Sequence, residues 1–168
     1  LYTESLCPDC KNTVLKSFEP AIKNGLLEMA EVTYVPAGNA SDDGYVSQKN
    51  VYSFKCQHGE PECWGNVYEN CMIRYAPNKL SELLMISCMY NRLNNKSAIE
   101  VVTATFQYCV RQHITDDLNY QRSMTCSNDG EGLELFDIAL KATPKHSFIP
   151  WASVEGKTLT QADRDAIN

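Results

Sequence analysis

The sequence predicts a single α/β domain in which a βαβ half and a ββα half are separated by a long helical, cysteine-rich insertion. Residues 1–36 pass from a short β-type run through a helical pattern to a second β-type run, and the β-type pattern returns after Pro144. Between these parts, residues 37–143 carry helical periodicity and six of the eight cysteines. We therefore expect one domain over residues 1–168, with a core of 1–36 and 144–168.

The first half centres on a helix that begins beside two cysteines, Cys7 and Cys10. Pro8 fits the first turn of that helix, where its missing N–H is not needed, whereas Pro20 should kink or end it. The expected elements are a strand over residues 2–6, a helix from 8 to 24, a strand over 26–35 and a closing turn at 36–39.

The insertion shows helical spacing of apolar residues in several stretches. Ser97 and Glu100 have the spacing of a capping box, which predicts that a helix begins there, and Asp129 can cap a later one. The expected helices cover residues 62–75, 80–93, 97–110, 116–124 and 129–140.

The second half is predicted from the residues after Pro144. A β-type run over residues 147–154 contains Pro150, and Glu155-Gly156 reads as a turn before a short return strand at 157–159. Thr160 is then expected to cap a last helix.

The cysteine count indicates an oxidising compartment of the secretory pathway, because eight cysteines are unusual in a cytosolic domain of this size. Two glycosylation sequons, at Asn39 and Asn95, agree with this compartment. The formal net charge of −6 argues against a nucleic-acid partner. No apolar run is long enough to cross a bilayer, so we expect no membrane insertion.

Cys7-Pro8-Asp9-Cys10 predicts thiol–disulfide exchange. A cysteine at a helix N-terminus can be stabilised as a thiolate, and a second thiol three residues on can resolve the mixed disulfide. We assign Cys7 as the attacking thiolate and Cys10 as the resolving thiol. An inert structural disulfide and half of a zinc site remain alternatives, although His58, His113 and His146 are too scattered to complete the latter.

Pro150 is the second indication of this chemistry. A proline inside a strand normally loses a ladder hydrogen bond. Thiol–disulfide oxidoreductases of the thioredoxin fold place a cis-proline against the cysteine pair, and the preceding residue offers its backbone to a peptide. Ile149-Pro150 resembles that feature, so we expect a cis bond and substrate binding at both residues.

A longer motif makes the resemblance specific. Cys56-Gln57-His58-Gly59 is followed, at the required spacings, by Glu62-Cys63, Asn66 and Cys71. This pattern is similar to the signature of the gamma-interferon-inducible lysosomal thiol reductase family. Residues 34–40 and 149–151 also resemble stretches of that family.

The resemblance implies a thioredoxin-like fold and reduction of disulfides in partly unfolded proteins by Cys7 and Cys10. It implies an acidic endosomal or lysosomal lumen, or secretion, with a small thiol as the reductant and with no cofactor or metal. We expect the remaining cysteines to form structural disulfides, although six cysteines allow 15 pairings and the sequence does not choose among them. These are Cys56, Cys63, Cys71, Cys88, Cys109 and Cys126.

Several alternatives remain open at this stage. An oxidase or isomerase could use the same scaffold, since fold does not determine the direction of the reaction. A binding module stapled by disulfides, with an inert Cys7–Cys10 bond, is a further alternative. A metal site built from Cys56, His58, Cys63 and Cys71 is a minor one.

Acidity makes the proposed chemistry difficult. A thiol with a pKa of about 8.5 is only on the order of 0.03% ionised near pH 5. Helix-end electrostatics provide at most ~2 kcal/mol, which is roughly 1.5 pKa units. The Asp9 carboxylate opposes thiolate formation and should make the cysteine pair more reducing than a version with histidine at that position.

Overall fold

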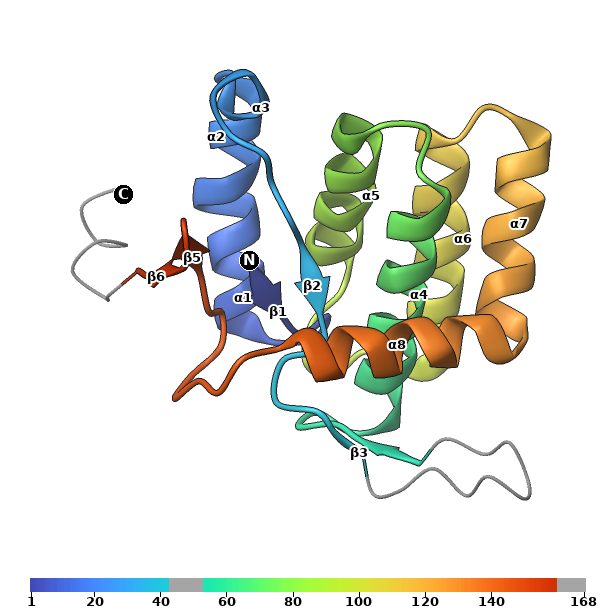
Figure 1. Cartoon of the computed structure of the whole chain (residues 1–168). Coiled ribbons are helices and arrows are strands. Elements are labelled where there is room, and N and C mark those ends of the chain that lie inside the picture. The colour runs from blue at the N-terminus through green and yellow to red at the C-terminus, as the bar shows by residue number, and fades with distance from the viewer. Residues whose placement is uncertain (43–52, 160–168) are drawn as a thin grey trace.

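The computed structural model describes residues 1–42 and 53–159, and Figure 1 shows its arrangement. An N-terminal helical rod and two short strands lie beside a group of longer helices. The elements are β1 (Tyr2–Thr3), α1 (Pro8–Thr13), the π-helix η1 (Val14–Phe18), α2 (Glu19–Lys23), α3 (Leu26–Met29), β2 (Val35–Pro36), β3 (Ser41–Asp42), β4 (Phe54–Lys55), α4 (Glu60–Tyr75), α5 (Lys79–Arg92), α6 (Ile99–His113), α7 (Asp117–Asn128), α8 (Gly130–Ala142), β5 (Ser153–Val154) and β6 (Lys157–Thr158).

The strand pairing is less extensive than expected. β1 pairs in parallel with β2, and on its other edge Tyr2 forms an antiparallel bridge with Trp151. The predicted strand over residues 147–154 is wrong in extent, because only Trp151 and β5 within it pair with other strands. β5 and β6 form the expected hairpin around the Glu155-Gly156 turn, where both residues have positive φ. Thr160 lies outside the described residues.

The N-terminal helical segment ends close to its predicted end, whereas the second strand is shorter than predicted. The helix runs past Pro20 to Lys23, and a π-helical turn directly before Pro20 widens the backbone where a proline would clash. Residues 26–29 form helix α3 instead of a strand. Gly25, at a φ of 93°, reverses the chain before them, and Leu-Leu-Glu-Met is a run of good helix formers.

The insertion is helical, as predicted, with one hairpin at its start. β3 and β4 pair in antiparallel fashion, and helix α4 packs against α5, α6, α7 and α8. Figure 1 shows α8 running across one end of the upright helices. The predicted capping box is wrong: Ser97 accepts a hydrogen bond from the Asn94 N–H, and Ala98 precedes the first turn of α6 without a side-chain cap.

The observed architecture is thus a mixed, mainly helical α/β protein with small sheets and three disulfides. The core forms two clusters, one among the insertion helices and one around Cys7, Cys10 and the N-terminal helix. Over the described ranges, no helix has the length and apolar character needed to cross a bilayer.

Candidate functional site

Cys7 and Cys10 are free thiols at the start of α1. Cys7 is the N-cap residue, and its sulfur accepts a hydrogen bond from the Cys10 N–H at 3.3 Å. Cys7 is 7% exposed and Cys10 is fully buried. Cys7, the thiol predicted to attack, is therefore more enclosed than the sequence suggests, but it remains the more accessible of the two.

The two thiols have opposite electrostatic environments. A hydrogen bond from the Cys10 side chain is the main influence that lowers the pKa of Cys7, and the N–H groups of Cys10 and Asp9 add to it. Burial and the Glu4 carboxylate act against this effect. Burial, followed by the interaction with Cys7, strongly raises the pKa of Cys10. The pair therefore combines an activated outer sulfur with a protonated inner one.

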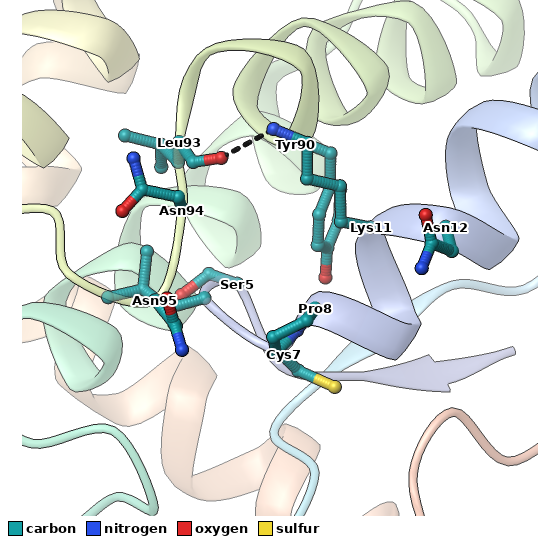
Figure 2. A pocket seen from close by; sticks show the side chains of 10 residues that line it. Ser5, Cys7, Pro8, Lys11, Asn12, Tyr90, Leu93, Asn94 and Asn95 are labelled. Atoms are coloured by element: carbon teal, nitrogen blue, oxygen red, sulfur yellow. Dashed lines mark hydrogen bonds between the residues drawn. The ribbon is translucent and has the colours of Figure 1, made fainter.

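A pocket of about 170 Å³ opens beside Cys7. Figure 2 shows Cys7 and Pro8 on one side of it, and Leu93 and Asn95 from the loop after α5 on the other. Lys11 spans the two sides through a hydrogen bond from its ammonium group to the Leu93 carbonyl at 2.7 Å. The pocket is therefore bordered by the more accessible of the two thiols.

Ile149 and Pro150 lie in the same region as the cysteines. The peptide bond between them is cis, and both residues are buried. Ile149 belongs to the core cluster that contains Cys7 and Cys10. The next residue, Trp151, exchanges two backbone hydrogen bonds with Tyr2, which fixes this loop to the strand that leads to Cys7.

Helix α4 supports the segment before Cys7. The Ser5 N–H donates to Asn66 Oδ1 at 2.9 Å, and the Ser5 hydroxyl donates to the Glu62 carbonyl at 3.1 Å. Gly65 permits this approach, because a Cβ at that position would overlap the Ser5 side chain. Residues of the cysteine-rich motif thus hold the backbone segment that leads to the cysteine pair.

The buried Glu4 and Glu62 and the partly buried His58 form a polar group, which we call the Glu4 cluster. Their potential ligand atoms all lie within 4.8 Å of one another, so these residues could hold a metal ion or share protons. His58 Nδ1 lies 2.5 Å from one oxygen of Glu62, and the His58 N–H donates to the other at 2.9 Å. Burial first, then repulsion from Glu62, raises the pKa of Glu4 to about 7.

A second buried hydrogen-bond network reaches the backbone carbonyl of Glu4. The Tyr34 hydroxyl is 3.3 Å from Glu69 Oε2 and 3.0 Å from the Tyr90 hydroxyl, which in turn donates to the Glu4 carbonyl at 2.8 Å. Thr3 also bonds to Tyr34. Burial raises the pKa of Glu69 well above its ordinary value. Burial therefore favours the protonated form of this carboxyl.

The other predicted residues are distributed as follows. The six remaining cysteines pair as Cys56–Cys63, Cys71–Cys126 and Cys88–Cys109. The minor metal-site alternative built on Cys56, Cys63, Cys71 and His58 is therefore wrong, because bonded sulfurs are not thiolate ligands. Asn39 and Asn95 are both exposed, and Asn95 borders the pocket beside Cys7.

Sequence reasoning missed the buried acids. Glu4 and Glu69 are 1% and 0% exposed, although glutamate is rarely buried. One signal was available for Glu4, because it interrupts a segment that leads as a strand into the cysteine pair. Glu69 offers no such signal, since nothing in the sequence indicates that both faces of α4 are covered.

The amino-acid sequence of the chain is similar to those of known proteins. The family described as "Gamma interferon inducible lysosomal thiol reductase (GILT)" matches residues 1–113. A protein of Carassius auratus named "Gamma-interferon-inducible lysosomal thiol reductase" is 31% identical over 172 residues, covering 100% of this chain and 63% of the relative. "GILT-like protein 1" of Drosophila melanogaster is 30% identical, over 85% of this chain and 58% of the relative.

A mouse protein extends the comparison to mammals. The "Gamma-interferon-inducible lysosomal thiol reductase" of Mus musculus is 27% identical over 95% of this chain and 60% of its own length. The chain thus spans about six-tenths of the length of these relatives.

Proposed function

Because this chain belongs to the gamma interferon inducible lysosomal thiol reductase family, we propose that it reduces disulfide bonds of partly unfolded proteins through Cys7 and Cys10. The observation that carries the proposal is the asymmetry of the pair: Cys7 has a lowered pKa and lines a pocket, whereas Cys10 is buried and protonated. This asymmetry assigns attack to one sulfur and resolution to the other.

The reaction proceeds in two exchanges. The Cys7 thiolate attacks one sulfur of the substrate disulfide, that bond breaks, and the departing substrate sulfur takes up a proton. Cys10 then loses its proton and attacks the Cys7 sulfur of the mixed disulfide, which releases the second substrate thiol. The substrate gains two electrons and two protons, the enzyme is left with a Cys7–Cys10 disulfide, and an external small thiol returns it to the dithiol.

Backbone recognition beside Pro150 is part of the proposal. A thioredoxin-like arrangement would place the Ile149 backbone along an extended substrate, and the fixed position of the Ile149–Trp151 loop beside β1 supports this. The pocket between Cys7 and Asn95 would accept a neighbouring substrate side chain.

We also propose an acidic lysosomal or endosomal compartment. The relatives from Carassius auratus and Mus musculus are named as lysosomal. The three disulfides agree with an oxidising route to that compartment.

The test is reduction of insulin between pH 4 and pH 8 by the wild type and by single-cysteine variants. Cys7→Ser should abolish turnover, because the attacking sulfur is lost, whereas Cys10→Ser should accumulate a mixed disulfide that is visible by mass spectrometry. The matched control removes Cys88 and Cys109 together, which changes two cysteines but leaves the redox pair, and it should retain turnover.

Two results would contradict the proposal. One is turnover by Cys7→Ser that equals the wild type. The other is a Cys7–Cys10 disulfide that mild reductant fails to open, which would favour a stapled binding module. An oxidase or isomerase would instead be recognised by a higher reduction potential than a reductase requires.

A further inference from the structure

The Glu4 side chain is buried near Glu62 of helix α4, three residues before Cys7. The Asn39 N–H donates to Glu4 Oε1, whereas Glu4 Oε2 is buried and has no hydrogen-bond partner among the described residues. Gly38 leaves room for the Glu4 side chain, because a Cβ at position 38 would overlap it. A buried carboxylate oxygen without a partner is costly when charged and much less so when protonated.

Glu4 has no positively charged side chain bonded to it among the described residues. Glu62 is fully buried and repels it, and both hydrogen-bonding groups of His58 that reach this cluster are directed at Glu62. The charge of His58 lowers the pKa of Glu4, but burial and the repulsion from Glu62 outweigh this effect. The other titratable groups that act with Glu4 are Cys7 and Cys10 on α1. This arrangement favours the neutral form of Glu4, in agreement with its pKa of about 7.

Glu4 also acts on the redox pair. The Cys7 N–H donates to the Glu4 carbonyl at 3.2 Å, which fixes the spacing between the two residues. When ionised, the Glu4 carboxylate raises the pKa of both cysteines. A protonated Glu4 no longer has this effect, so its charge state and that of Cys7 are coupled.

We propose that Glu4 is an acid-responsive positioning residue, which takes up a proton in an acidic compartment and thereby stabilises the Cys7 thiolate there. The inference rests on the proposed function and deepens it. It addresses the difficulty of thiolate chemistry in acid, because acidification removes the negative charge that opposes ionisation of Cys7. A proton is favoured over a metal ion as the occupant, because two of the three potential metal ligands already bond to each other.

The experiment measures the rate at which iodoacetamide alkylates Cys7, located by mass spectrometry, since only the thiolate reacts. The proteins are the wild type, Glu4→Gln and the control Glu60→Gln, which removes an exposed carboxylate near the start of α4. Glu4→Gln should match the wild type near pH 5 and react about three- to tenfold faster near pH 7, the effect of one-half to one pKa unit. Glu60→Gln should follow the wild type throughout.

A second variant tests the same coupling in the opposite direction. Glu62→Gln removes the repulsion that keeps Glu4 neutral and frees His58 to bond to it, so Glu4 should stay ionised to lower pH. Alkylation of Cys7 in this variant should be slower than in the wild type near pH 6. A purely structural role for the cluster would not move the two variants in opposite directions.

Three results decide the inference. Identical profiles for the wild type and Glu4→Gln from pH 5 to pH 8 would overturn it. A wild-type profile that changes on addition of EDTA or Zn²⁺, while Glu4→Gln does not respond, would identify a metal as the occupant and also overturn it. The expected profiles without insulin reduction would support the coupling and contradict the reductase function, because alkylation requires no turnover.

Discussion

The N-terminal segment with the free thiols and the helices of the insertion are stabilised in different ways. The insertion is crosslinked: one disulfide joins α4 to α7, another joins α5 to α6, and a third ties the chain before α4 to its first turn. The N-terminal segment has no such bond and is attached through buried polar contacts, among them Ser5 to Asn66 and Tyr90 to Glu4.

The difference would allow the N-terminal segment to exchange disulfides, as proposed, while the insertion keeps its own. Cys7 and Cys10 lie on the same helical turn, so a bond between them joins no separate elements and its formation or loss changes little else. Two of the other pairs, Cys71–Cys126 and Cys88–Cys109, each join two different helices. Reductant should therefore act mainly on the stability of the insertion, and pH on the contact between α4 and the N-terminal segment, where Glu4 and Glu69 are buried.

The largest expected effect concerns the crosslinks. Replacing Cys71 and Cys126 by alanine should lower the free energy of unfolding by about 4 kcal/mol, because this bond closes the longest loop, with a separation of 55 residues. Removing the Cys56–Cys63 bond, with a separation of 7, should cost only about 2 kcal/mol. Urea unfolding of the purified proteins measures both.

Equal losses, or a larger loss for the shorter loop, would show that strain or packing outweighs loop closure in this protein. Chemical reduction of only an oxidised Cys7–Cys10 pair serves as the reference, and it should lower the free energy of unfolding less than either replacement, because that bond closes the shortest loop.

A smaller effect concerns pH and Glu4. Its pKa is raised from 4.5 to about 7 in the folded protein, so folding favours the protonated form. The resulting stability is fully present below pH 4.5 and is lost as the pH rises through about 7. Between pH 5 and pH 8 the free energy of unfolding of the wild type should therefore fall by about 2 kcal/mol relative to that of Glu4→Gln. Urea unfolding at each pH measures this difference.

Glu60→Gln is the matched control. The Glu60 carboxyl is exposed, so its removal should change the pH dependence of stability little. Glu69→Gln, like Glu4→Gln, should make the free energy of unfolding depend less on pH, because burial raises the pKa of Glu69 as well. If Glu4→Gln lost stability more steeply with rising pH than the wild type, the raised pKa of Glu4 would be contradicted.

The smallest effect concerns Asp9, an exposed residue between the two thiols. Its negative charge disfavours the thiolate and so favours the disulfide, which makes the pair more reducing. Asp9→His should raise the reduction potential by about 30 mV, which corresponds to a tenfold change in the two-electron equilibrium. Equilibration with glutathione measures this value, with Asp9→Asn expected to lie between the two. An unchanged or more reducing Asp9→His would refute the argument.

Periodicity was a sufficient guide to the long helices of the insertion. The predicted stretches at 62–75 and 80–93 differ from α4 and α5 by two residues or fewer at each end. Asp129 caps α8 as expected, through a hydrogen bond from the Glu131 N–H. Shorter segments were less predictable, as α3 shows, because four residues carry too little pattern to separate helix from strand.

The sequence by itself determined that two cysteines stand at a helix start, that a helical cysteine-rich segment interrupts an α/β pattern, and that the chain resembles one family. These properties are local, because spacing and turn chemistry act over a few residues. Only the tertiary structure decided which of the six other cysteines are bonded to each other, and that Glu4 lies buried between Glu62 and Cys7. The pairing depends on how the helices of the insertion pack against one another, and the burial of Glu4 depends on how α4 packs against the N-terminal segment. The free energy of a buried carboxyl is set by neighbours distant in the chain.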